Sequence, residues 1–395
     1  MEIIHLLFIL AFGACVGSFL NVVIYRLSRG QNMVFPGSHC PKCGRAIRWF
    51  DNIPVVSWLV LRGRCRQCHK PISPGYPLVE ASTAILVGGL YVCYFWLDIR
   101  DGAGRFTHSW PMFVAHACLL AGLLACSIID ISHWIVPLEA CWVVSAIALA
   151  VAAAAPPSSQ FLPRVPPVLG AMGLAAAIGL GVSLLLQRMR LLQPSFIDAR
   201  DPPLKDTGSE ESSEPPTSIA ISKAHGVNPR LEILREVLFL GPAVILAAGA
   251  YLLVTKVPAA GQAWAQVSTE ASGWPAGNFA AFQAALVGYL VGGTWIWGIR
   301  ILGTLGFGKE AMGLGDAHIL AAVGAVCGWI VPSLVFFIAP IFALLWALHL
   351  LLARRQRELP YGPWLATATL VVMLFYDGCL ELLRPYFAAF QWTRT

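Results

Sequence analysis

The chain has 395 residues, of which 57% are hydrophobic and only 12% are charged. This charged share is about half that of an ordinary soluble domain, and a single soluble core of this size could not bury so much apolar surface. The net charge of +6 is not pooled in one patch with interleaved aromatic residues, so no nucleic-acid partner is indicated. The composition predicts an integral membrane protein in a lipid bilayer.

Apolar segments of about 20 residues, the length needed to cross a bilayer, recur along the chain. We therefore expect an all-α polytopic membrane protein with about nine or ten transmembrane helices. The first segment lacks the preceding basic stretch and the small-residue cleavage site of a secretion signal, so it is expected to be a retained anchor. Pro332 is the reason for separating the eighth span from the ninth. The expected spans are 3–25, 78–97, 111–129, 135–155, 166–187, 237–255, 280–303, 317–331, 333–353 and 363–382.

Lysine and arginine residues are concentrated in alternate loops, which predicts how the spans are oriented. If the loop 29–77 is cytoplasmic, most of the 27 lysines and arginines are cytoplasmic too, as the positive-inside rule requires. The segment 188–236 is rich in proline, serine and glutamate, and we expect it to be a disordered cytoplasmic insert. The expected organisation is a first transmembrane helix (1–28), a cytoplasmic Cys-rich domain (29–77), helices that include Asp130 (78–187), the insert (188–236), a second helical core (237–382) and a short outward-facing tail (383–395).

Four of the eleven cysteines lie outside the apolar spans, as two Cys-x-x-Cys pairs in the loop 29–77. They are Cys40, Cys43, Cys65 and Cys68. Four thiolates with this spacing suit a tetrahedral structural zinc ion in a small ribbon-like loop domain. Two disulfides are the alternative, but the reducing cytoplasm favours zinc.

Carboxylates in membrane spans are costly, so each one is a candidate functional group. Asp130 ends the third expected span, and Asp316 precedes the eighth in a Gly-x-Gly-Asp run whose glycines would allow another chain to approach closely. Two adjacent carboxylates share a proton, so that one can activate water while the other polarises a peptide carbonyl. Helix dipoles predict the charged form at Asp316 and the protonated form at Asp130. Two independent capping or ion-paired aspartates are the alternative.

Several segments, in order along the chain, resemble the bacterial type IV prepilin peptidases, a family of Gly-x-Gly-Asp membrane aspartyl proteases. The resemblance implies an enzyme of the bacterial inner membrane that cuts the leader from type IV prepilins or type II secretion pseudopilins at the cytoplasmic face. It implies Asp130 and Asp316 as the proteolytic pair and the four cysteines as a metal cluster. It also implies N-methylation of the new N-terminus with S-adenosylmethionine, an activity associated with the Cys-rich loop. The segments are 17–27, 40–43, 48–58, 62–68, 71–80, 129–130, 313–316, 320–324 and 359–364.

Three features depart from that family: Glu139 replaces the aspartate of a Leu-Pro-Asp run, His318 replaces a lysine after the second aspartate, and the insert 188–236 is longer. These departures leave the identity of the substrate open, and they also leave open that the chain is an inactive relative. A Gly-x-Gly-Asp intramembrane protease with other substrates is a rival, but it would lack the Cys-rich loop. A transporter would place acids near the bilayer midplane in repeated halves, which this sequence does not do. The oligomeric state and the particular pilin are not encoded in these motifs.

Overall fold

The computed structural model describes residues 2–35, 37–100, 103–155, 162–193, 195, 229–269, 276–308, 310–352 and 360–389. Over these residues the chain is helical, and its β-structure is limited to two isolated bridges in the Cys-rich loop. Within the described residues, seven helices are long and apolar enough to cross a membrane, and one bent helix pair could form an eighth span. The predicted fold class, an all-α polytopic membrane protein with a Cys-rich loop, is confirmed.

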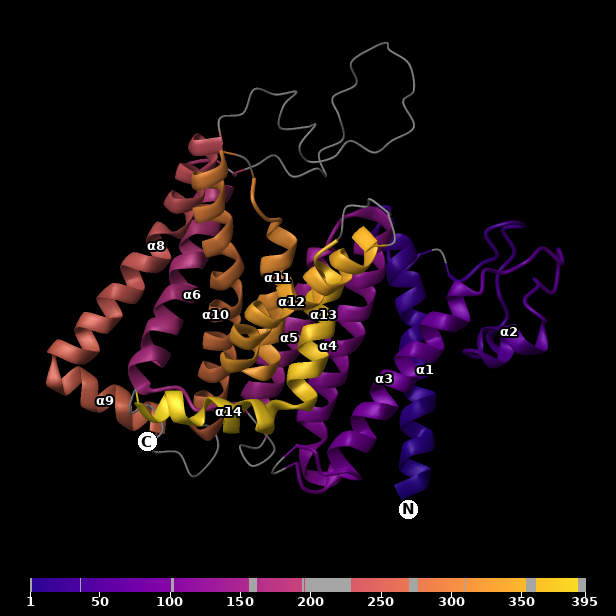
Figure 1. The fold of residues 1–395 in the computed structure, drawn as a ribbon, viewed down its shortest axis with the longest axis horizontal. Helices are drawn as coiled ribbons and strands as arrows, with labels where there is room; N and C mark the ends of the chain where they lie inside the picture. The colour runs from indigo at the N-terminus through magenta and orange to yellow at the C-terminus, as the bar shows by residue number, and fades with distance from the viewer. Residues whose placement is uncertain are drawn as a thin grey trace, which may run out of the picture.

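Successive long helices run in opposite directions, so their ends alternate between the two ends of the bundle (Figure 1). The Cys-rich loop, with η1 and α2, lies beside the bundle between α1 and α3. In chain order the helices are α1 (Glu2–Leu27), η1 (Trp49–Asn52), α2 (Val56–Val60), α3 (Gly75–Phe95), α4 (Phe106–His133), α5 (Leu138–Ala154), α6 (Pro167–Arg188), α8 (Pro229–Lys256), α9 (Pro258–Thr269), α10 (Ala276–Phe307), α11 (Leu314–Cys327), α12 (Ile330–Leu352), α13 (Gly362–Leu374) and α14 (Tyr376–Ala389).

Two of the expected spans are shorter helices. The span expected at 135–155 is α5, with 17 residues, and the span expected at 317–331 is α11, with 14 residues. A helix of 14 residues extends only about 21 Å, less than the ~30 Å of a bilayer core. The break that ends α11 is at Gly328, which has a positive φ of 78°. It is not at Pro332, which lies in the first turn of α12.

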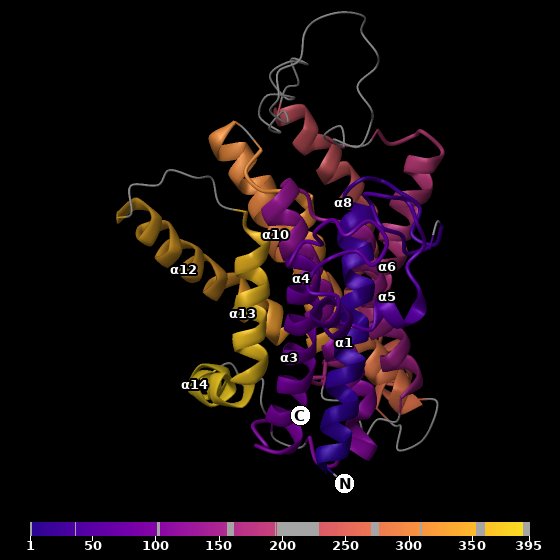
Figure 2. The ribbon, with the colours of Figure 1, turned by 90° about the vertical axis from the view of Figure 1, so that its right-hand side faces the viewer.

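The last expected span, 363–382, is broken. It consists of α13 and α14, which meet at an angle of 80°. In both views α14 lies across the end of the bundle at which α1 begins (Figures 1 and 2). The expected boundary of a tail at 383 is therefore inside α14, and residues 390–395 lie outside the described part of the chain.

The expected insert 188–236 is only partly within the described structure. Its residues 194 and 196–228 lie outside the described part of the chain. Its last residues are not disordered, because α8 already begins at Pro229. The physical reason is a contact that composition does not reveal: Glu236 forms a buried ion pair with Arg300 of α10, at 2.8 Å.

The short helix α11 lies in the core of the bundle, in contact with α4, α5, α10, α12 and α13. Apart from His318, every residue from Ala317 to Cys327 is buried. Gly288 of α10 and Gly324 of α11 face each other with no room for a Cβ atom, so the two backbones are in direct contact. This close packing holds α11, whose first turn carries Asp316, in a fixed place.

Candidate functional site

The structure brings the two predicted aspartates together from distant parts of the sequence. Asp130 lies in the last turn of α4, and Asp316 lies in the first turn of α11, which packs against α4. Asp130 is buried, Asp316 is half-buried, and the two carboxylates interact electrostatically. Two acidic groups so close together can share a proton, as a catalytic pair of carboxylates must.

A third helix, α13, contributes a backbone group to this site. The N–H of Gly362, at the start of α13, donates a hydrogen bond to Asp130 Oδ2 at 3.0 Å. A Cβ atom on Gly362 would lie 2.7 Å from that same oxygen, so only glycine allows this approach. Asp130 therefore lies at the C-terminal end of its own helix α4 and also at the N-terminus of α13. The two helix dipoles oppose each other there, so they do not by themselves predict the charge state of Asp130. Nothing in the sequence predicts a role for Gly362, because its partner Asp130 is remote along the chain.

The two glycines before Asp316 serve different purposes. A Cβ on Gly315 would overlap Val136, in the connection between α4 and α5, so Gly315 is needed for close packing. A Cβ on Gly313 would have its nearest neighbour at 4.0 Å, the Oδ2 atom of Asp316 itself. Of the two positions, Gly313 is therefore the one that leaves free space beside the carboxylate.

The two residues that depart from the family pattern lie on α11 and α5. The ring of His318, two residues after Asp316, lies 6.0 Å from that of Trp142 in an edge-on arrangement. Glu139 lies in the first turn of α5. Neither departure removes a carboxylate from the pair.

The four predicted cysteines of the Cys-rich loop also lie together. Their sulfur atoms are all within 4.8 Å of one another, and Cys40 Sγ lies 4.0 Å from Cys68 Sγ. Zinc–sulfur bonds of about 2.3 Å in a tetrahedron would place the sulfurs roughly 3.8 Å apart, so the set fits a zinc ion. A disulfide would need about 2.05 Å, and each of the four is a free cysteine.

The two Cys-x-x-Cys pairs form matching knuckles. The N–H of Cys40 donates to the carbonyl of Arg45 at 2.9 Å, and the N–H of Cys65 donates in the same way to Lys70 at 3.0 Å. Each knuckle closes with an antiparallel bridge. Backbone N–H groups of Cys68 and then Gln67 lower the pKa of Cys65 to about 7, which favours a thiolate, the form that binds metals.

A large cavity lies between the Cys-rich loop and the helices α1 and α3, with a volume of about 1090 Å³. Its lining includes Cys40 and Cys65 and reaches down α1 as far as Cys15. Basic side chains outnumber acidic ones on its wall, where the carboxylates of Asp51 and Glu80 and several aromatic rings also lie. The lining of this cavity contains neither Asp130 nor Asp316, so the chain carries two separate places for chemistry.

Comparisons with known proteins agree with the resemblance. Residues 11–94 match the family model described as the bacterial peptidase A24 N-terminal domain. The prepilin leader peptidase/N-methyltransferase of Myxococcus xanthus is 45% identical over 133 residues, which are 33% of this chain and 36% of that protein. Its namesake in Pseudomonas aeruginosa is 39% identical over 150 residues, 32% of this chain and 47% of that protein. No solved structure matches the chain.

A helical membrane bundle with a four-cysteine loop and two converging aspartates describes a polytopic membrane protein that carries a Gly-x-Gly-Asp run. Over residues 11–94 the chain is similar to the N-terminal domain of the bacterial A24 peptidases, in agreement with the resemblance of its motifs. The chain spans about a third to a half of the length of the curated relatives it matches. The matched domain ends before Asp130, so the roles of the two aspartates rest on their geometry.

Proposed function

We propose that this protein is an aspartyl endopeptidase that removes the leader peptide from type IV prepilins or type II secretion pseudopilins. One observation carries the proposal: Asp130 and Asp316 come from different helices and meet in the same membrane bundle that holds the Cys-rich loop. The homologous proteins that bear the name prepilin leader peptidase/N-methyltransferase support the choice of substrate.

The mechanism needs only the two carboxylates and a water molecule. One carboxylate takes a proton from the water, whose oxygen attacks the carbonyl carbon of the scissile peptide bond. The other, protonated, donates a hydrogen bond to the carbonyl oxygen and later supplies the proton that the leaving amine requires. The N–H of Gly362 fixes the orientation of the Asp130 carboxyl group through its bond to Oδ2. The free space at Gly313 gives an extended substrate backbone access to the pair.

Co-expression with candidate prepilins, followed by intact-mass measurement of the pilin, tests both proposed activities. Loss of the leader mass reports peptidase activity, and a further gain of one methyl group reports N-methylation. An unprocessed pilin with every candidate tested would contradict the proposal.

We propose a structural zinc ion at Cys40, Cys43, Cys65 and Cys68, because their sulfur atoms all lie within 4.8 Å of one another, close enough to converge on one ion. Zinc there would hold the two knuckles together in a loop that has little hydrophobic core of its own. Elemental analysis of the purified protein tests this, with one zinc per chain as the expected result.

We further propose that the cavity beside this cluster binds S-adenosylmethionine, which supplies the methyl group for N-methylation. The volume of about 1090 Å³ is sufficient for the cofactor together with a peptide N-terminus. Arg48 on its wall suits the cofactor's carboxylate, Glu80 suits a cationic group, and Trp58 offers an aromatic face to the adenine. Calorimetry with S-adenosylmethionine should show binding that Trp58→Ala weakens, whether or not a pilin is present.

We propose that the Cys-rich loop and the aspartate pair lie at the cytoplasmic face of the bacterial inner membrane, because most lysines and arginines lie in the loops on that side. Lys42 of the loop and Lys256 at the end of α8 are both exposed, and the proposed orientation puts them on opposite sides of the membrane. A membrane-impermeant amine reagent should label Lys42 only in inside-out vesicles and Lys256 only in right-side-out ones. The reverse pattern would overturn the orientation.

A further inference from the structure

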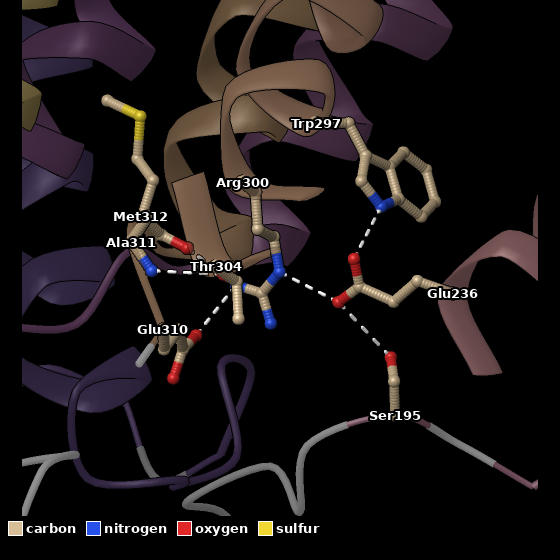
Figure 3. A network of polar contacts seen from close by, with 8 residues as sticks. All are labelled: Ser195, Glu236, Trp297, Arg300, Thr304, Glu310, Ala311 and Met312. Atoms are coloured by element: carbon tan, nitrogen blue, oxygen red, sulfur yellow. Dashed lines mark hydrogen bonds and ion pairs between the residues drawn. The ribbon is translucent and has the colours of Figure 1, made fainter. Parts of the chain in front are cut away.

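A buried network of polar side chains joins α8, α10 and the segment that precedes Asp316 (Figure 3). At its centre is Arg300 of α10, which is 1% exposed. Its Nε donates to Glu236 Oε1 at 2.8 Å, and its Nη1 donates to Glu310 Oε1 at 2.7 Å. An arginine so deeply buried between two carboxylates must be held there by specific contacts, because a buried charge is costly unless it is paired.

The network also forms hydrogen bonds to the segment 310–312, which immediately precedes the Gly-x-Gly-Asp run. Nη1 of Arg300 also donates to the backbone carbonyl of Met312 at 2.7 Å. One turn further along α10, Thr304 Oγ1 accepts a hydrogen bond from the N–H of Ala311 at 3.2 Å. A Cβ atom on Gly303 would lie 2.7 Å from the Ala311 side chain, so the segment lies directly against α10.

The other side of the arginine is anchored to α8. Glu236 is 1% exposed, and its Oε2 accepts a hydrogen bond from Trp297 Nε1 at 3.1 Å. The planar guanidinium can donate in two directions at once, towards Glu236 and towards the segment 310–312 (Figure 3). A lysine ammonium, a point charge on a flexible four-carbon stem, lacks the planar fork of donors and would not reproduce this geometry.

We propose that Arg300 is a positioning residue for the aspartate pair. By fixing residues 310–312 on α10, it determines where α11 begins and hence where Asp316 lies relative to Asp130. This inference rests on the proposed peptidase function. A purely structural role is the alternative, in which the ion pair contributes only to the stability of the bundle.

The double variant Arg300→Met/Glu236→Leu separates these two roles. Replacing a buried ion pair by apolar residues of similar size often leaves stability unchanged or raises it, whereas removing one partner leaves an unpaired charge. Glu310 loses its partner in this variant, but its side chain is 30% exposed and can be solvated by water. The double variant should therefore insert and fold with its segment 310–312 no longer held by Arg300. We expect kcat for leader cleavage to fall about a hundredfold with KM unchanged, since a displacement of roughly 1 Å in a catalytic group has an effect of that size.

Arg300→Lys should not restore kcat, because it keeps the charge without the two-directional geometry. Arg235→Met/Glu232→Leu is the matched control, because it replaces the other ion pair of α8 as a whole. Arg235 bonds to Glu232 and Gln193, outside the segment 310–312. It should cleave like the wild type. A folded double variant with wild-type kcat would overturn the inference, and so would one in which KM rises while kcat is retained.

Thr304→Val provides a milder test that leaves the ion pair intact. Loss of its hydroxyl should raise the amide hydrogen exchange of Ala311, measured by mass spectrometry of the peptide 310–316, and lower kcat by a smaller factor than the double variant. Unchanged exchange and unchanged kcat would contradict the positioning role even if the double variant failed to fold. Asp316→Asn is the reference: if it still cleaves, the proposed peptidase mechanism fails. If it is inactive while the other variants are fully active, only the role of Arg300 fails.

Discussion

The Cys-rich loop and the aspartate pair are assembled in opposite ways. The four cysteines lie in one short stretch of chain, and each knuckle is closed by hydrogen bonds between neighbouring residues such as Cys40 and Arg45. The aspartates come from α4 and α11, and their position depends on α10 and α13 as well. A local site can be lost or retained independently of the bundle, whereas the aspartate pair depends on the packing of several helices.

Removal of the metal cluster should have the largest energetic effect and should separate the two sites. A structural zinc ion contributes on the order of 10 kcal/mol to the folding of its domain. Cys40→Ser/Cys43→Ser removes two of the four sulfur ligands, so we expect loss of zinc and of N-methylation with at least partial leader cleavage. Metal analysis and the intact mass of the processed pilin measure both.

The matched control is Cys93→Ser/Cys379→Ser, which changes two free cysteines of the helices α3 and α14. It should keep zinc and both activities. A cluster variant that inserts normally but has lost cleavage completely would show that the loop also presents the substrate to Asp130 and Asp316.

Substitution within the aspartate pair should have the next largest effect. Asp130→Asn or Asp316→Asn removes a carboxylate that the proposed mechanism needs, and we expect cleavage to fall by about 10⁴-fold or more, equivalent to roughly 5.5 kcal/mol. Zinc content should not change. Asp98→Asn, in the exposed connection after α3, should cleave normally. Wild-type cleavage by either variant of the pair would rule out an aspartyl mechanism.

A methyl group beside Asp130 should have a smaller effect on the same site. In Gly362→Ala the new Cβ would lie 2.7 Å from Asp130 Oδ2, so the carboxylate or α13 must shift. We expect kcat to fall about 10- to 100-fold, in keeping with small displacements of catalytic groups. Gly378→Ala is the control, because its Cβ would meet no atom within 4 Å. Equal kcat in the two variants would indicate that the bond from Gly362 is not needed for cleavage.

The sequence predicted the local site more completely than the assembled one. Spacing alone identified the four cysteines, because a Cys-x-x-Cys pair encodes its own knuckle. Membrane cost and the Gly-x-Gly-Asp run singled out Asp130 and Asp316, but their proximity depends on helix packing that no single segment reveals. The composition of 188–236 concealed Glu236, whose partner Arg300 lies on another helix. One property could have drawn attention to Glu236 and Arg300: each is a charged residue within a helix that is long and apolar enough to cross a membrane.

The surface ion pair of the Cys-rich loop should have the smallest effect. Arg66 donates from Nη2 to Asp51 Oδ1 at 2.6 Å and also contacts Asp51 through Nε, and this bond lowers the pKa of Asp51 below its ordinary value. A carboxylate with a lowered pKa stabilises the folded loop above the pKa of the unfolded chain, about 3.9, and loses that contribution as the pH falls through the lower folded value. Because the side chain of Arg66 is 46% exposed, solvent screens the pair, so Asp51→Asn should keep zinc and cleavage at neutral pH. Its zinc should be released at slightly lower temperature than in the wild type at pH 7, and about 1 M salt should reduce this difference, because ions screen a solvent-exposed pair. A difference that salt leaves unchanged would assign the effect to packing around Asp51 rather than to its charge.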